Sequence, residues 1–281
     1  HVGPALSAVD VDRDRDAERR AAALGATALF GGQGGDALFF RLPTGQVVGD
    51  LVRARGFGAL ADPLVHQWPR WLRRSVWSVL AEAAGRPRAP VDGGWSALLG
   101  PRARADPPPP HPWLADAAGL PPAKRLQIQA VVGASHHHWG RARRSRSAQV
   151  VQPLLAQPIL ELCLGTPTWR LVAGGRDRAL ARAAFAADLP AEVVDRRSKG
   201  ALSTHYARRV ASSLDFLRPH LLDGVLVGAG VLDHAAVEAA LTPHALMTTG
   251  AGARLTRAAL VESWARYWQT QAPDLARAAR R

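Results

Sequence analysis

The sequence predicts a predominantly helical α/β protein. Most of the chain consists of stretches in which apolar residues recur at helical spacing, and one short segment is convincing as a buried strand. With 281 residues, 47% of them hydrophobic, the chain can fill a substantial core. We therefore expect residues 1–281 to form one globular domain.

The first predicted elements surround a glycine-rich turn. Residues 12–24 (DRDRDAERRAAAL) carry acids in the first turn and are followed by Gly25, which is typical of a helix with a left-handed C-terminal cap. Residues 26–30 (ATALF) then predict a short buried strand that runs into GGQGGD at residues 31–36. The glycines therefore follow a strand, where bare backbone can approach a ligand closely.

The remainder is predicted to be helices separated by loops. Residues 63–84 have helical apolar spacing, and we expect Pro69 to bend the first turn. Prolines at about 101–112 predict an exposed, polyproline-like loop. A lone strand leaves backbone groups unpaired, so further strands are either hidden from this pattern or belong to chain that precedes His1. Further helices are expected at 122–145, 153–164, 176–188, 203–221, 233–241 and 254–270.

The composition limits the classes of function. The chain has 36 basic and 23 acidic residues, and lysine occurs only at Lys124 and Lys199. A solvated arginine-rich surface is the simpler interpretation of this charge and is favoured over a nucleic-acid partner. The single Cys163 argues against a disulfide framework, and no apolar run is long enough to span a membrane. The cytoplasm is the simplest compartment.

Two motifs carry residues suited to chemistry. GGQGGD lacks the Lys-Ser/Thr of a Walker A loop and the dinucleotide spacing, so it is either a tight turn or a ligand loop. Its Asp36 could bind a metal that bridges phosphates or cap the next helix. The second motif is GGRDRALARAAFAADLPAEVVDRRSKG at 174–200. Lys199 there either supplies a required compact ammonium or belongs to a basic helix end.

Three stretches together resemble a known family. FGGQGGDALF, QPLLAQPILELCLGTPTW and the 174–200 motif are similar to the later half of the synthetase domain of the asparagine synthetase family. They are most like its branch of lasso-peptide macrolactam cyclases. The resemblance covers most of residues 14–206, and the third stretch is the most specific.

The resemblance implies an ATP pyrophosphatase-type fold, of the adenine nucleotide alpha hydrolase-like kind. Such a domain uses ATP and Mg²⁺ to adenylate a carboxylate and then passes the acyl group to an amine. By position, Asp36 would hold the magnesium and Lys199 would contact the α-phosphate as the catalytic lysine. The residues that would bind ATP are Gly31, Gly32, Gln33 and Gly34.

Departures from the family pattern point to an unusual substrate. Family acids are replaced here by Gln33, Ala37 and Ala156, which argues for a peptide in place of free aspartate. The family's Ser-Gly-Gly-x-Asp-Ser pyrophosphate loop does not occur in the sequence. We therefore expect the chain to be the C-terminal portion of a synthetase, incomplete alone, whose partners would include the missing N-terminal part and precursor-processing proteins.

The preferred function is ATP-dependent closure of a macrolactam isopeptide bond in a ribosomal peptide through an acyl-adenylate. One alternative keeps the chemistry and makes asparagine from free aspartate with glutamine hydrolysis. The other is a non-catalytic, basic helical module that binds nucleic acid or protein.

Overall fold

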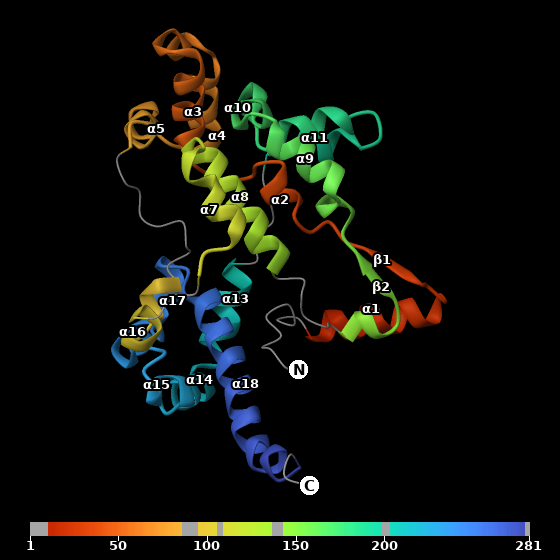
Figure 1. Cartoon of the computed structure of the whole chain (residues 1–281), viewed down its shortest axis with the longest axis vertical. Coiled ribbons are helices and arrows are strands. Elements are labelled where there is room, and N and C mark those ends of the chain that lie inside the picture. The colour runs from red at the N-terminus through yellow and green to blue at the C-terminus, as the bar shows by residue number, and fades with distance from the viewer. Residues whose placement is uncertain (1–10, 86–94, 106–108, 137–142, 198–202, 279–281) are drawn as a thin grey trace.

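The computed structural model describes residues 11–85, 95–105, 109–136, 143–197 and 203–278 (Figure 1). The described residues are predominantly helical with one small parallel sheet, which confirms the predicted class. Among them, no helix is both long and apolar enough to cross a membrane.

The helices and strands follow one another in this order: α1 Val11–Ala23, β1 Ala28–Phe30, α2 Gly35–Leu38, α3 Gln46–Arg55, α4 Leu64–Leu72, α5 Val76–Ala83, α6 Pro101–Ala105, α7 Pro112–Asp116, α8 Pro122–His136, β2 Gln149–Val151, α9 Gln157–Gly165, α10 Thr168–Leu171, α11 Ala179–Ala184, α12 Ala191–Val194, α13 Ser203–Ala211, α14 Leu214–Leu222, α15 Val225–Gly228, α16 His234–Ala240, α17 Pro243–Thr248 and α18 Ala251–Ala278. Short 3₁₀ turns are η1 Phe57–Ala61, η2 Trp95–Leu98, η3 Ala117–Gly119, η4 Arg143–Arg146, η5 Pro153–Leu155 and η6 Ala173–Gly175.

The sheet differs from the prediction in two ways. β1 has a partner, because β2 pairs with it in parallel with Leu29 opposite Val150. Of the two alternatives left open for the lone strand, the first holds, because a strand hidden from the sequence pattern lies within the chain. The expectation of a buried strand is wrong at Phe30, whose side chain is 77% exposed. In Figure 1 the two strands and α1 lie to one side of the helical groups.

Several helix boundaries also need correction. The helix predicted at 63–84 is two helices, because Arg73 adopts a left-handed conformation (φ 54°) and Ser75 then caps α5 by accepting a hydrogen bond from Ser78 N. The stretch predicted as 203–221 likewise divides into α13 and α14. The proline-rich segment is not all loop: Pro101 and Pro112 begin short helices, where a first-turn residue needs no N–H donor. α3 was not predicted.

Other predicted helices are shorter or shifted. The segment predicted at 176–188 is helical as α11, and the one predicted at 153–164 begins at Gln157 after a 3₁₀ turn. α8 starts at the predicted position, and part of its predicted extension lies outside the described residues. The helix at 233–241 is confirmed by α16, and the one at 254–270 lies within the longer α18.

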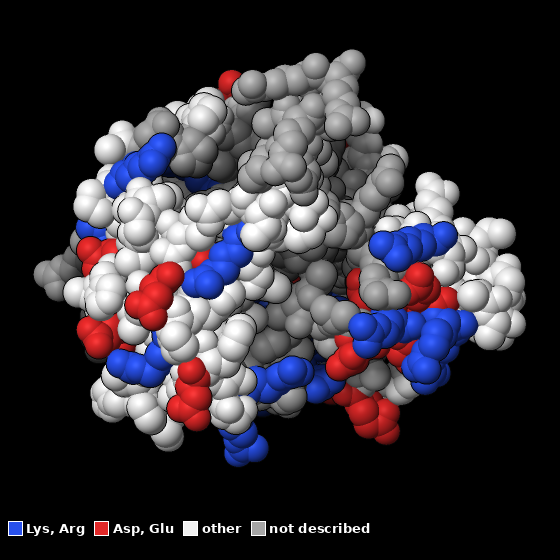
Figure 2. Space-filling view, turned by 90° about the horizontal axis from the view of Figure 1, so that it is seen from below, with Lys and Arg blue, Asp and Glu red and all other residues white. Residues whose placement is uncertain are grey.

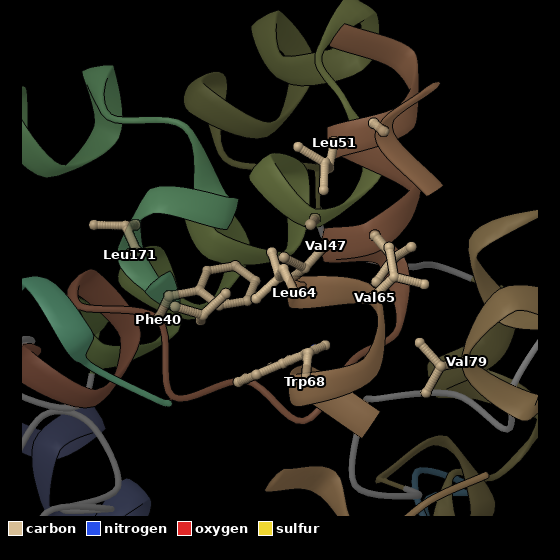
Figure 3. Close-up of a cluster of buried hydrophobic side chains, with 12 residues drawn as sticks. Phe40, Val47, Leu51, Leu64, Val65, Trp68, Val79 and Leu171 are labelled. Carbon is tan, nitrogen blue, oxygen red and sulfur yellow. The ribbon is translucent and has the colours of Figure 1, made fainter. Parts of the chain in front are cut away.

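The largest buried cluster next to the candidate site joins α3, α4, α5 and α10. Phe40 and Trp68 are its largest fully buried side chains. Figure 3 shows the labelled residues of this cluster, which come from those helices and, for Phe40, from the segment between α2 and α3. A smaller cluster packs α2 against α8 and α9. A separate core holds α13 to α18 together and includes Leu98 from η2. The glycine turn, between β1 and α2, therefore lies where the sheet meets the helices of these first two clusters.

Candidate functional site

The glycine turn is wedged against the segment that follows β2. Gly31 N donates to Val151 O at 2.9 Å, and Gln33 N donates to Gln152 Oε1 at 3.2 Å. A methyl group on Gly31 would lie 2.4 Å from Gln152 Oε1, and one on Gly34 would lie 2.3 Å from Leu155 Cδ2. Gly34 also has a φ of 84°, which favours glycine. The positive φ accounts for glycine at position 34, whereas at position 31 the clash is with the end of a flexible side chain that can shift, and a methyl group on Gly32 would meet open space.

Asp36, at the start of α2, lies between two arginines. Its side chain is 43% exposed, with Arg178 Nη1 at 3.3 Å from Oδ1 and Arg41 Nη1 at 3.7 Å from Oδ2. Arg178, the residue directly before α11, has a left-handed conformation (φ 53°), and Phe40, directly before Arg41, is also left-handed (φ 62°). Such conformations cost about 1 kcal/mol or more in non-glycine residues, so the surrounding structure must hold these two in place.

Asp177 also forms ion pairs with Arg41 and Arg178. Its side chain is 10% exposed and lies 3.4 Å from Arg41 Nε, 3.4 Å from Arg178 Nε and 3.2 Å from Arg182 Nη2. The glycine-turn motif and the 174–200 motif, which are more than 130 residues apart, are thus joined by alternating acids and arginines. The acids reduce the repulsion among the guanidinium groups and fix their positions.

Two adjoining clefts flank this network. The first, the glycine-turn cleft, has a volume of about 420 Å³ and is lined by Gly32, Gln33, Gly34, Asp36, Ala37, Arg41, Leu42, Ala130 and Ala134. The second, the arginine cleft, has a volume of about 240 Å³ and is lined by Arg41, Leu42, Pro43, Trp68, Trp71, Leu72, Asp177, Arg178, Arg182, Arg196 and Arg197. Arg41 and Leu42 contribute to both clefts.

The structure brings most of the predicted site residues together. Gly32, Gln33, Gly34 and Asp36 line the glycine-turn cleft, while Gly31 packs against Gln152. Lys199 lies outside the described residues, so its role stays a prediction. Arg197, two residues before it, lines the arginine cleft.

A buried polar cluster behind α2 was missed by the sequence interpretation. Lys124 Nζ donates to Thr166 O and to Gln127 Oε1, both at 2.6 Å, and Gln127 Nε2 donates to Leu38 O at 2.7 Å. Burial lowers the pKa of Lys124 to about 8. The scarcity of lysine was the only sequence signal for this residue. The cluster ties α8 to α2 and to the end of α9.

Asp50 supports the same cluster from α3. Its side chain is 1% exposed, and its carboxylate accepts hydrogen bonds from Ala123 N at 3.3 Å and Lys124 N at 3.2 Å, in the first turn of α8. Thr168 Oγ1 donates to it from α10 at 3.2 Å. Burial raises the pKa of Asp50, because water is excluded from the charged form.

Comparison with known proteins identifies the family. Residues 16–269 match the family model described as asparagine synthase. The match includes all three stretches that resemble the family and extends through α13 to α17 into α18, where the sequence showed no diagnostic residues. Comparisons with curated proteins and with solved structures found no match. The match spans most of the chain, which therefore belongs to the asparagine synthase family of ATP-dependent amide ligases.

Proposed function

We propose that this chain forms part of the ATP site of an AMP-forming amide ligase that closes a macrolactam isopeptide bond in a ribosomal peptide of the lasso type. One observation carries the proposal: Arg178 and Arg41 bridge Asp36 of the glycine turn to Asp177 of the 174–200 motif, between two adjoining clefts. The adenine nucleotide alpha hydrolase-like fold and a cytoplasmic location are part of the same proposal.

The residues of the glycine-turn cleft fit the phosphates of ATP. Arg41 lies on its wall, and Arg178 approaches Asp36, which lines it. Guanidinium groups bind phosphate oxygens through paired N–H donors, and a glycine at position 32 leaves room for a ligand beside the backbone. If a triphosphate bound here, Arg41 and Arg178 would contact its oxygens in place of the carboxylates of the two acids.

Magnesium fits these residues less well. No group of three or more potential metal-ligating side chains occurs among the described residues, and the one carboxylate in the glycine-turn cleft, Asp36, lies beside two guanidinium groups. Asp36 as a magnesium ligand stays a prediction that requires the arginines to release its oxygens. In this family magnesium would neutralise phosphate charge.

The proposed reaction has two transfers. A side-chain carboxylate oxygen of the peptide forms a bond to the α-phosphorus of ATP as the bond from that phosphorus to pyrophosphate breaks. The peptide's N-terminal amine then attacks the acyl carbon, AMP leaves with the bonding electron pair, and the amine loses its proton to solvent. Positioning and charge stabilisation by fixed cations are the main requirements. Lys199 would contact the α-phosphate in both transfers.

Three neutral residues favour a peptide over free aspartate. Gln33 and Ala37 line the glycine-turn cleft, and Ala156 directly precedes α9. Each replaces an acid of the asparagine-forming pattern, and at positions 33 and 37 the glycine-turn cleft loses charges suited to the ammonium group of a free amino acid. The Ser-Gly-Gly-x-Asp-Ser loop does not occur in residues 1–281, and we propose that a further segment or polypeptide supplies it.

Binding to nucleic acid has less support. On the face shown in Figure 2, the described basic and acidic side chains are interspersed. At the candidate site, Arg41 and Arg178 are paired with acids. Such pairing reduces the net positive field that a polyanion would meet.

ATP–pyrophosphate exchange by the natural full-length polypeptide, with a precursor peptide or aspartate as the carboxylate, tests the function. We expect peptide-dependent exchange that Lys199→Ala abolishes and Arg178→Gln reduces by about tenfold or more, the loss of one charge-assisted contact. Arg208→Gln, on the exposed face of α13, is the charge-matched control and should retain exchange. Unaltered exchange in Lys199→Ala would refute the role of this lysine, and exchange with aspartate alone would favour asparagine synthesis.

A further inference from the structure

We propose that the arginine cleft binds an acidic side chain of the peptide substrate, with an apolar neighbour of that residue resting on Trp71 and Leu72. This inference rests on the proposed function, because it names the part of the site that holds the carboxylate to be activated.

The walls of the arginine cleft differ in chemistry. One wall is apolar: Trp68 is 1% exposed and donates its indole N–H to Thr44 O at 2.7 Å, which fixes it as a rigid floor. Trp71 and Leu72 are half-buried at the end of α4 and face the cleft. The lining also includes the arginines of the 174–200 motif. A ligand with one charged and one apolar side chain complements both walls.

The charges in this cleft are unbalanced. Its lining contains five arginines and one acid, Asp177, which pairs with Arg41, Arg178 and Arg182. Within the part of the chain that the structure describes, neither Arg196 nor Arg197 has a carboxylate partner. Both are exposed and line the cleft. Two adjacent guanidinium groups in this position suit a carboxylate, which can accept paired hydrogen bonds.

Arg182 fixes the backbone that presents these two arginines. It donates to Val194 O and, at 3.0 Å, to Arg196 O, while Asp177 holds its other side. Its own side chain is 12% exposed, so it is largely unavailable to a ligand. The backbone that carries Arg196 is thus anchored before any ligand arrives, which lowers the entropy lost on binding.

The position of the cleft fits the reaction. Arg41 and Leu42 line both clefts, so a carboxylate in the arginine cleft would lie next to phosphates in the glycine-turn cleft. The smaller volume, about 240 Å³, suits one or two side chains and not a second nucleotide.

Two fluorescent hexapeptides test the inference without ATP. One has the sequence Gly-Phe-Asp-Phe-Asp-Gly and the other Gly-Phe-Asn-Phe-Asn-Gly, both with amidated C-termini, and binding to the full-length protein is measured by anisotropy. We expect the acidic peptide to bind about tenfold more tightly at low salt, the effect of a charge-assisted contact. The double variant Arg196→Gln/Arg197→Gln should remove this preference. The matched pair Arg208→Gln/Arg209→Gln, exposed on α13, should retain it.

The outcomes separate the inference from the proposed function. Equal binding of both peptides, or a preference that survives in Arg196→Gln/Arg197→Gln, overturns the inference even if ATP–pyrophosphate exchange is normal. A preference that depends on Arg196 and Arg197 supports the carboxylate site even where exchange is absent, in which case only the ligase function fails. Trp71→Ala should weaken both peptides equally, and an unchanged affinity would contradict the apolar half of the site. Far-ultraviolet circular dichroism confirms that each variant is folded.

Discussion

At the scale of single residues, the glycines of the turn perform different tasks. Gly34→Ala places a methyl group against the end of the Leu155 side chain at a φ of 84°, so we expect a loss of about 1 to 3 kcal/mol, mainly from backbone strain. Gly32→Ala meets no atom within 4 Å and should change the free energy of unfolding by less than about 0.5 kcal/mol. Urea unfolding of both variants measures the difference.

The same pair decides between a tight turn and a ligand loop. If the turn approaches ATP, Gly32→Ala should weaken ATP binding while leaving stability intact, because its methyl group would occupy the glycine-turn cleft. Normal ATP affinity in Gly32→Ala would argue against a ligand loop. Equal stability of the two variants would contradict the backbone strain at Gly34.

The buried amine of Lys124 makes stability depend on pH. Burial lowers its pKa from 10.5 to about 8, so between these values the unfolded chain binds more protons than the folded one. The free energy of unfolding should therefore rise with pH across this window, by up to about 3 kcal/mol from this residue. Below pH 8 both states are protonated, and the contribution no longer changes.

The titration of Cys163 would interfere with this measurement, so the variants compared lack this residue. Burial raises the pKa of its thiol, which makes stability fall at alkaline pH and opposes the effect of Lys124. Urea titrations between pH 7 and 10.5 therefore compare Cys163→Ala with Cys163→Ala/Lys124→Met. The rise should be present in the first protein and absent in the second. Parallel curves would show that Lys124 titrates normally in the folded state.

At the scale of elements, local sequence predicted those that depend on local signals. α1 and α16 were placed within a residue or two, because their charges, caps and spacing agree. β2 was missed because three residues are too few to show an alternating pattern, and their role depends on pairing with β1 more than 100 residues earlier. The break at Arg73 was also invisible, since a left-handed arginine has no compositional signal.

The candidate site was predicted to the same limited extent. The sequence placed the glycine turn at the end of a strand and singled out the 174–200 motif, and both line the adjoining clefts. The pairing of Asp36 with Arg178 and of Arg41 with Asp177 could not be predicted, because it depends on tertiary contacts between segments about 140 residues apart in the sequence. The resemblance to the family supplied roles, and tertiary packing supplied the partners.

At the scale of the whole molecule, two cores raise a question about folding. One unites α3, α4, α5 and α10, the other unites α13 to α18, and no buried residue belongs to both. The sequence predicts one domain over residues 1–281. If the two cores unfold together, that prediction is supported; weak coupling would instead produce two transitions. We expect two transitions.

A matched pair of buried carboxylates can assign each transition. Glu262 is fully buried and accepts hydrogen bonds from Val225 N, Leu226 N and Arg266 Nε, whereas Asp50 plays the same part in the first core. Glu262→Gln and Asp50→Asn should each cost about 1 to 3 kcal/mol, because each replaces an acceptor oxygen with an amide donor. Hydrogen exchange in urea should show early opening of α18 in the first variant and of α3 in the second. Opening of both helices together in either variant would mean that the cores fold as one cooperative unit.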